Sequence, residues 1–149
     1  MGRAAAALVL FFLLASAVQA QTVTIAGGDR VSIGDAAYRF LGIEAPDPRQ
    51  VCNDGYPAGR EAIKALQRLM QGRRIACDVR GRDPSGRSLA TCTADGRDLG
   101  EAMVRAGMAW ADPRTGAGYR DVERDAEADR LGVHDHECIL PWKWRADPR

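Results

Sequence analysis

Residues 38–47 read YRFLGIEAPD, and residues 83–90 read DPSGRSLA. Each stretch places one arginine, Arg39 or Arg87, at the edge of an apolar strand, and the first stretch continues into two carboxylates at a turn. Metal-assisted attack on a phosphodiester needs such side chains, because guanidiniums can bind the phosphate while carboxylates hold a cation and activate water. The two stretches therefore predict strands that carry a site for phosphate chemistry.

Outside these stretches, the hydrophobic pattern predicts short strands followed by helices. Alternating apolar residues and glycine turns predict three strands within residues 22–43, and apolar spacing predicts a helix over about 58–71. We further expect a hairpin at about 75–79 and 88–93, a helix capped by Asp98 and ending at Gly107, and a last helix at about 119–131. This order predicts an α+β fold, either a five-stranded OB-fold-type β-barrel with about three α-helices or a flat antiparallel sheet with helices on one side. Residue patterns alone leave both architectures open.

The N-terminal segment has the features of a secretory signal peptide. Arg3 provides a positive start, residues 4–15 are an unbroken apolar run, and residues 18–20 offer a cleavage site. The run is too short to hold a transmembrane helix well, and no later segment is apolar enough to span a bilayer. We therefore expect a signal peptide at residues 1–20 and one domain at residues 21–149. The mature protein would be periplasmic or secreted, without stable membrane association.

The net charge argues against a protein that coats nucleic acid. The full chain has 21 lysine and arginine residues and 20 acidic ones, and loss of Arg3 with the signal peptide leaves 20 against 20. Nonspecific coating of nucleic acid depends on an excess of basic residues. An enzyme that concentrates a few arginines in one cleft remains compatible with a neutral chain.

Four cysteines in an exported chain predict two disulfide bonds. Cys77 and Cys92 lie symmetrically about the turn at residues 83–86, so we expect them opposite each other in the hairpin. This pairing leaves Cys52 to bond with Cys138, which would tie the loop before the first helix to the C-terminal tail. Two buried free thiols at positions 77 and 92 are the alternative.

From Val23 to Arg145, the chain resembles the thermonuclease (micrococcal-nuclease-like, TNase-like domain) family. The shared motifs occur in the family's order at residues 27–29, 39–47, 59–62, 83–87, 95–99, 103–107 and 141–145. The last of these, PWKWR, is similar to the ending of exported bacterial members. The resemblance implies an OB-fold barrel and a calcium-dependent hydrolase of DNA or RNA.

Carried over motif by motif, the resemblance implies roles for five residues. Arg39 and Arg87 would bind and polarise the phosphodiester. Asp29 and Glu44 would hold calcium, a hard ion that prefers carboxylate, carbonyl and water oxygens. Asp47 would activate or orient the attacking water. The expected substrate is nucleic acid that is single-stranded or locally unpaired, and the expected state is a monomer.

The acids depart from the family's pattern. The family's Asp-Gly-Asp-Thr turn is replaced by residues 26–30, AGGDR, which lack one acid and place Arg30 beside the metal ligand. Glu44 stands where the family has aspartate and Asp47 where it has glutamate, so the two carboxylates have exchanged lengths. A misplacement of about 1 Å can lower a rate roughly 100-fold, so we expect a slow or altered enzyme.

Two functions without catalysis remain open. Arg30 could pair with Asp29 or Glu44 and take the place of the cation. The chain would then be a catalytically silent OB-fold module that binds nucleic acid, another polyanion or a protein partner. A small disulfide-stabilised envelope protein with no ligand in the cleft is the third reading.

Overall fold

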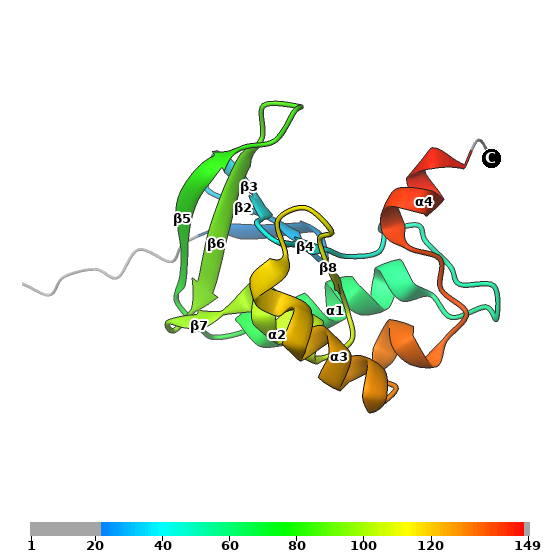
Figure 1. Ribbon diagram of the computed structural model, residues 1–149. Helices are drawn as coiled ribbons and strands as arrows, with labels where there is room; N and C mark the ends of the chain where they lie inside the picture. The colour runs from blue at the N-terminus through cyan, green and yellow to red at the C-terminus, as the bar shows by residue number, and fades with distance from the viewer. Residues whose placement is uncertain (1–21, 148–149) are drawn as a thin grey trace, which may run out of the picture.

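The computed structural model describes residues 22–147, whose arrangement is drawn in Figure 1. The predicted signal peptide at residues 1–20 lies outside the described residues. Within the described part, no helix has the length and apolar character needed to cross a membrane. The strands are β1 (Val23–Gly27), β2 (Arg30–Ile33), β3 (Ala36–Phe40), β4 (Ile43–Glu44), β5 (Ile75–Arg82), β6 (Ser88–Ala94), β7 (Arg97–Asp98) and β8 (Trp110–Ala111). The helices are α1 (Ala58–Met70), α2 (Leu99–Arg105), α3 (Arg120–Ala128) and α4 (Pro141–Ala146), with 3-10 helices η1 (Ala117–Tyr119) and η2 (Gly132–Asp135).

The main sheet runs in the order β1-β2-β3-β6-β5, with β7 paired to β6, and β4 and β8 form a separate two-stranded ladder. All pairs are antiparallel except β3 and β6, which run parallel with Arg39 opposite Leu89. Arg87 immediately precedes β6, so this parallel pairing brings it to the strand that carries Arg39. The pairing therefore places residues 38–47 and residues 83–90 beside each other.

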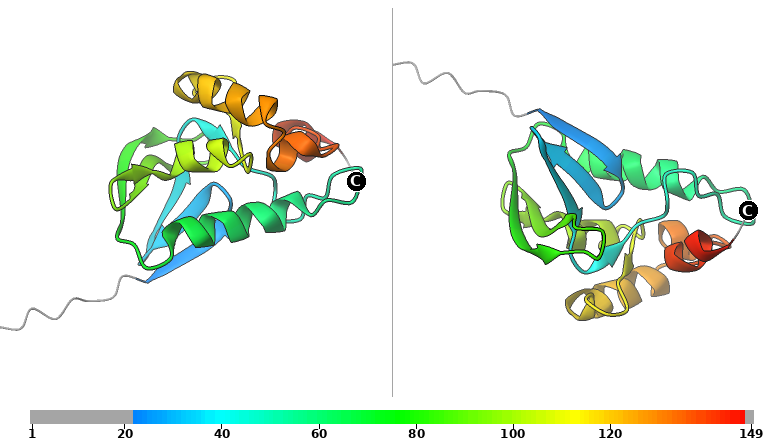
Figure 2. Two further views of the ribbon diagram at one scale, coloured as in Figure 1. Left: turned by 90° about the horizontal axis from the view of Figure 1, so that it is seen from below. Right: turned by 90° about the horizontal axis from the view of Figure 1, so that it is seen from above.

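The predicted fold class is confirmed: the chain is α+β with an OB-like arrangement. In the sheet order of the described strands, β1 and β5 are the two edges, so the sheet does not close fully. Helix α1 packs along β1 in both views of Figure 2. The helix count is four rather than about three, because the short α4 has too few residues to show a helical period.

The core lies between the sheet and helices α1 and α2. Ala62 and Leu66 of α1 are fully buried, as the apolar face predicted, and pack with Val31 and Phe40 of the sheet. Helix α2 begins at the predicted cap, where Oδ1 of Asp98 accepts hydrogen bonds from two backbone amides of the first turn at 2.7 and 3.2 Å. Both helices thus pack against the sheet that carries Arg39.

Both predicted disulfides are present. Cys77 and Cys92 face each other in the β5–β6 register, so the hairpin symmetry gave the correct pair. Cys52 bonds with Cys138 across 86 residues. This second bond fixes the chain that leads to α4 against the loop that precedes α1, and the two segments lie side by side in Figure 2.

Candidate active site

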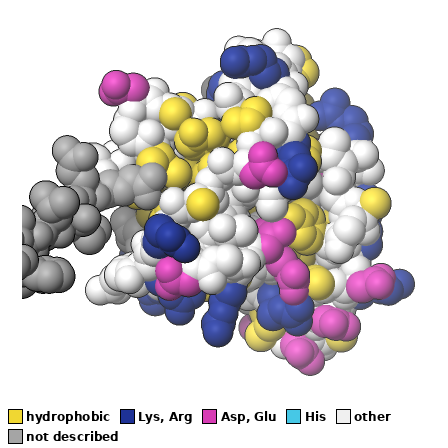
Figure 3. Space-filling model, turned by 90° about the vertical axis from the view of Figure 1, so that its left-hand side faces the viewer, with side chains coloured by type: hydrophobic (Ala, Val, Ile, Leu, Met, Phe, Trp, Pro, Cys, Tyr) yellow, Lys and Arg dark blue, Asp and Glu magenta, His cyan; other side chains and the backbone are white. Residues whose placement is uncertain are grey.

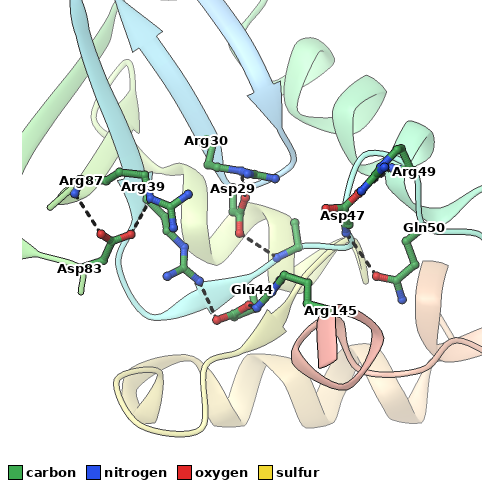
Figure 4. Close-up of polar contacts among 11 residues, drawn as sticks. Asp29, Arg30, Arg39, Glu44, Asp47, Arg49, Gln50, Asp83, Arg87 and Arg145 are labelled. Atoms are coloured by element: carbon green, nitrogen blue, oxygen red, sulfur yellow. Dashed lines mark hydrogen bonds and ion pairs between the residues drawn. The ribbon is translucent and has the colours of Figure 1, made fainter. Parts of the chain in front are cut away.

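All five residues predicted for the site line one pocket of about 200 Å³. Its lining consists of Asp29, Arg30, Arg39, Glu44, Asp47, Arg87, Arg114 and Arg145. Figure 4 shows the acids and most of the arginines converging from the sheet, the β4–α1 loop and α4. Side chains that lie up to 116 positions apart in the sequence (145 minus 29) therefore meet at one place.

Asp29 occupies the turn between β1 and β2 and is only 3% exposed. Its Oδ1 accepts from Nε of Arg30 at 3.1 Å, and its Oδ2 accepts from the backbone amide of Ala45 at 3.3 Å. Gly28 allows the turn to pack closely against α1, since a Cβ at position 28 would lie 2.7 Å from the Cβ of Ala62. Burial raises the pKa of Asp29 above its ordinary value, Arg30 and Arg39 oppose this rise, and the charge of Glu44 adds to it.

Glu44 is held between two arginines. It lies on β4, and its Oε1 accepts from Nη2 of Arg39 on β3 at 2.6 Å. Its Oε2 accepts from Nη2 of Arg145 on α4. Burial lowers the pKa of the Arg39 guanidinium, but the negative charges of Glu44 and Asp29 outweigh burial and raise it, so Arg39 stays charged.

Arg87 is positioned by Asp83. Oδ2 of Asp83 accepts from Nε of Arg87 at 2.6 Å, while its Oδ1 accepts from the backbone amides of Ser85 and Arg87, each at 2.9 Å. Burial opposes ionisation of Asp83, but the hydrogen bonds and charge of Arg87 hold its pKa below the ordinary value. Asp83 therefore caps its own turn and orients the arginine, and it is absent from the lining of the pocket.

Asp47 lies in the loop between β4 and α1, with its Oδ1 accepting from the backbone amide of Arg49 at 3.0 Å. Its own backbone amide donates to Oε1 of Gln50 at 3.2 Å. The loop sits directly on the start of α1, because a Cβ at Gly59 would lie 2.0 Å from the carbonyl oxygen of Asp47. Contact with α1 therefore positions the backbone of Asp47 beside the pocket.

Two arginines of the pocket carried no predicted role. Arg114 follows β8 in a turn where Oδ1 of Asp112 accepts from the amides of Arg114 and Thr115 at 2.8 and 2.9 Å. The Asp-Pro-Arg-Thr sequence at residues 112–115 is typical of a turn, so the exposed position of Arg114 could have been predicted from the sequence. Arg145 belongs to the PWKWR motif, but no local pattern relates it to Glu44, 101 positions earlier.

The pocket carries more positive than negative side chains. Five arginines and three carboxylates line it, so its formal charge is +2. Among the described residues, no group of three or more histidine, cysteine or acidic side chains is arranged to hold a metal ion. Asp29 and Glu44 supply the hard oxygens that calcium prefers. Each of these carboxylates is bonded to a guanidinium, so a cation would have to displace an arginine to bind them.

The fold and site together define an OB-like domain with an arginine-rich pocket. The profile of the staphylococcal nuclease homologue family matches residues 37–135, and the chain belongs to that family. The resemblance seen in the sequence is thereby confirmed.

Individual relatives cover most of the chain. Protein ParB of Escherichia coli is 29% identical over 97% of this chain and 90% of its own length. An uncharacterized endonuclease of Escherichia coli O157:H7 is 27% identical over 93% of this chain and 94% of its own. Succinoglycan biosynthesis protein ExoI of Rhizobium meliloti is 30% identical over 84% of this chain, which spans 64% of that protein.

Proposed function

We propose that the chain is an exported nuclease that hydrolyses phosphodiester bonds of DNA or RNA. Membership of the staphylococcal nuclease homologue family and a relative named an endonuclease support this proposal. The observation that carries it is that Arg39 of β3 and Arg87, which immediately precedes the neighbouring parallel strand β6, converge on a pocket that also contains three carboxylates.

In this proposal, Arg39 and Arg87 bind the scissile phosphate. Attack on phosphorus builds negative charge on the equatorial oxygens, and a guanidinium neutralises that charge with paired, directional hydrogen bonds. Glu44 and Asp83 hold the two guanidiniums in place at 2.6 Å, so little reorganisation is needed when the substrate arrives. Asp47 orients the attacking water, since its carboxylate lines the pocket.

Calcium is the cofactor expected from the family, with Asp29 and Glu44 as its ligands. Because both carboxylates are paired with arginines, calcium must compete with Arg30 at Asp29 and with Arg39 and Arg145 at Glu44. The side chains of Arg30 and Arg145 are 31% and 43% exposed, so each has room to turn toward solvent. We therefore assign no step of the reaction to the ion and expect its affinity to be lower than a free pair of carboxylates would give.

The expected substrate is a flexible, single-stranded or locally unpaired strand, and the expected state is a monomer. The face of the molecule in Figure 3, seen from the β5 side of Figure 1, carries acidic and basic side chains intermingled, so this face offers no basic surface that would bind nucleic acid by bulk charge. The mature domain would comprise residues 21–149 and act in the periplasm or outside the cell. Its two disulfides are typical of such an oxidising compartment.

One observation favours a second candidate, a catalytically silent module that binds a polyanion. Arg30 pairs with Asp29, so a guanidinium already supplies positive charge where the family's cation would bind. Oligonucleotide binding without calcium and without turnover would favour this candidate.

Cleavage of a labelled single-stranded DNA by Arg39→Ala tests the proposed function. We expect a loss of at least about 100-fold in kcat/KM, because the variant removes transition-state charge stabilisation. Arg105→Ala is the matched control, since Arg105 pairs with Glu101 on the surface of α2. Undiminished cleavage by a folded Arg39→Ala protein would defeat the proposal.

A further inference from the structure

A second cavity, of about 540 Å³, adjoins the arginine pocket. Asp47, Arg49, Trp144, Arg145 and Asp147 line it. Asp47 and Arg145 line both spaces, so the cavity opens beside the position of the proposed water-orienting carboxylate. Its volume falls in the range of roughly 300–1,000 Å³ that is usual for small-molecule sites.

Helix α4 presents Trp144 to this cavity. Successive residues of an α-helix are turned by about 100°, so Trp142 and Trp144 point to nearly opposite sides. Trp142 packs into the small apolar cluster with Cys52 and Val133. Trp144 is thereby directed outward, where it forms a wall of the cavity while remaining partly buried.

The position of α4 is fixed independently of any ligand. The Cys52–Cys138 disulfide ties its leading segment to the β4–α1 loop. Gln50 Nε2 donates to the carbonyl of Ile139 at 2.7 Å, and Arg145 bonds with Glu44. The indole is therefore held in place before binding, which lowers the entropy that a ligand must overcome.

The charges of the two spaces differ. Among the residues that the structure describes, the lining of the arginine pocket has a formal charge of +2, whereas the two arginines and two aspartates that line the second cavity sum to zero. A phosphate therefore favours the first space, and a neutral aromatic group favours the second, where it can stack on an indole. In a nucleic acid, phosphate and base are joined through one sugar. A nucleotide could therefore place its phosphate in the arginine pocket and its base in the adjoining cavity.

We propose that the cavity formed by the β4–α1 loop and α4 is a nucleobase subsite, in which the base next to the scissile phosphate stacks on Trp144. The proposal rests on the proposed nuclease function. A further cavity of about 250 Å³ shares Arg39 and Arg114 with the opposite part of the arginine pocket. A strand crossing the pocket would therefore have one space on each side of its central phosphate.

The test compares two fluorescent octamers of equal charge, octathymidylate and an abasic octamer, in equilibrium binding to the purified chain. We expect Trp144→Ala to weaken binding of octathymidylate roughly ten-fold and to leave binding of the abasic octamer unchanged. Trp144→Phe should retain most of the thymidine preference. Lys143→Ala is the matched control, because Lys143 is exposed on the same helix but does not line the cavity.

Equal weakening of both octamers, or no weakening of either, would overturn the subsite. Equal affinity of the wild-type chain for the two octamers would also overturn the subsite. If Trp144→Ala fails to fold, tryptophan fluorescence of the wild-type chain decides: octathymidylate should quench it and the abasic octamer should not. Equal quenching by both octamers would overturn the subsite. A chain that discriminates the octamers but cleaves neither would contradict only the nuclease function.

Discussion

The two disulfides should contribute unequally to stability, although each is a single covalent bond. We consider the paired substitutions Cys77→Ala with Cys92→Ala, and Cys52→Ala with Cys138→Ala. The first bond closes a loop of 15 residues within one hairpin, and the second closes 86 residues. Each bond joins a buried cysteine, Cys92 or Cys52, to a half-buried one, and alanine adds no unpaired polar group.

Loop-closure entropy gives the magnitudes. A loop of 15 residues corresponds to about 3 kcal/mol at 25 °C, and the same relation gives about 4.5 kcal/mol for 86 residues. Losing the long-range bond should therefore lower the free energy of unfolding by about 1.5 kcal/mol more than losing the hairpin bond. For a domain of this size, the corresponding difference in melting temperature is about 5 °C.

The bonds should also differ in their effect on function. Only Cys138 leads into α4, which carries Arg145 to the pocket and Trp144 to the neighbouring cavity. Chemical denaturation of both double variants measures the energies, and oligonucleotide affinity at a temperature where both are folded measures the functional effect. An equal or larger loss of stability in the hairpin variant would refute the loop-closure reasoning. Unchanged affinity after loss of Cys52–Cys138 would refute the positioning role of the bond.

Three further predictions concern the arginine pocket. Asp29→Asn should raise the melting temperature at pH 7, because burial raises the pKa of Asp29 and the folded state therefore loses stability as the pH rises above 3.8. The gain should shrink toward acid pH, and a lower melting temperature at pH 7 would mean that the arginine pairs outweigh burial. Arg30→Thr should lower the calcium concentration for half-maximal cleavage several-fold, since it removes the competitor at Asp29; an unchanged value would show that Arg30 and calcium do not compete. Arg87→Lys should lower kcat/KM at least about ten-fold, because lysine lacks the planar fork that pairs with a phosphate, and retention of full activity would assign Arg87 a role as a simple point charge.

Local features of the fold were predictable because their causes are local. The turn at residues 83–86 set the hairpin and with it the Cys77–Cys92 pair, and Asp98 marked the start of α2. The parallel register of Tyr38 with Ser88 was not predictable, since it joins strands that are separated in the sequence by β4, α1 and β5. Only the family resemblance related Arg39 to Arg87.

The site was predictable as a set of positions but not as a set of contacts. The motif order named the five residues that meet in the pocket, and it raised the pairing of Arg30 with Asp29 as an alternative. It did not indicate that Arg145 would reach Glu44, because that contact depends on where the disulfide and the apolar cluster hold α4. Long-range packing of this kind leaves no period in the sequence.

The most direct measurement is cleavage of labelled single-stranded DNA by the wild-type chain and by Arg87→Ala, each with calcium and with chelator. The account predicts cleavage by the wild-type chain that chelator abolishes and that Arg87→Ala reduces at least about 100-fold. Absence of cleavage by folded wild-type protein, or wild-type rates in folded Arg87→Ala, would contradict the assignment of this arginine pocket as a nuclease site.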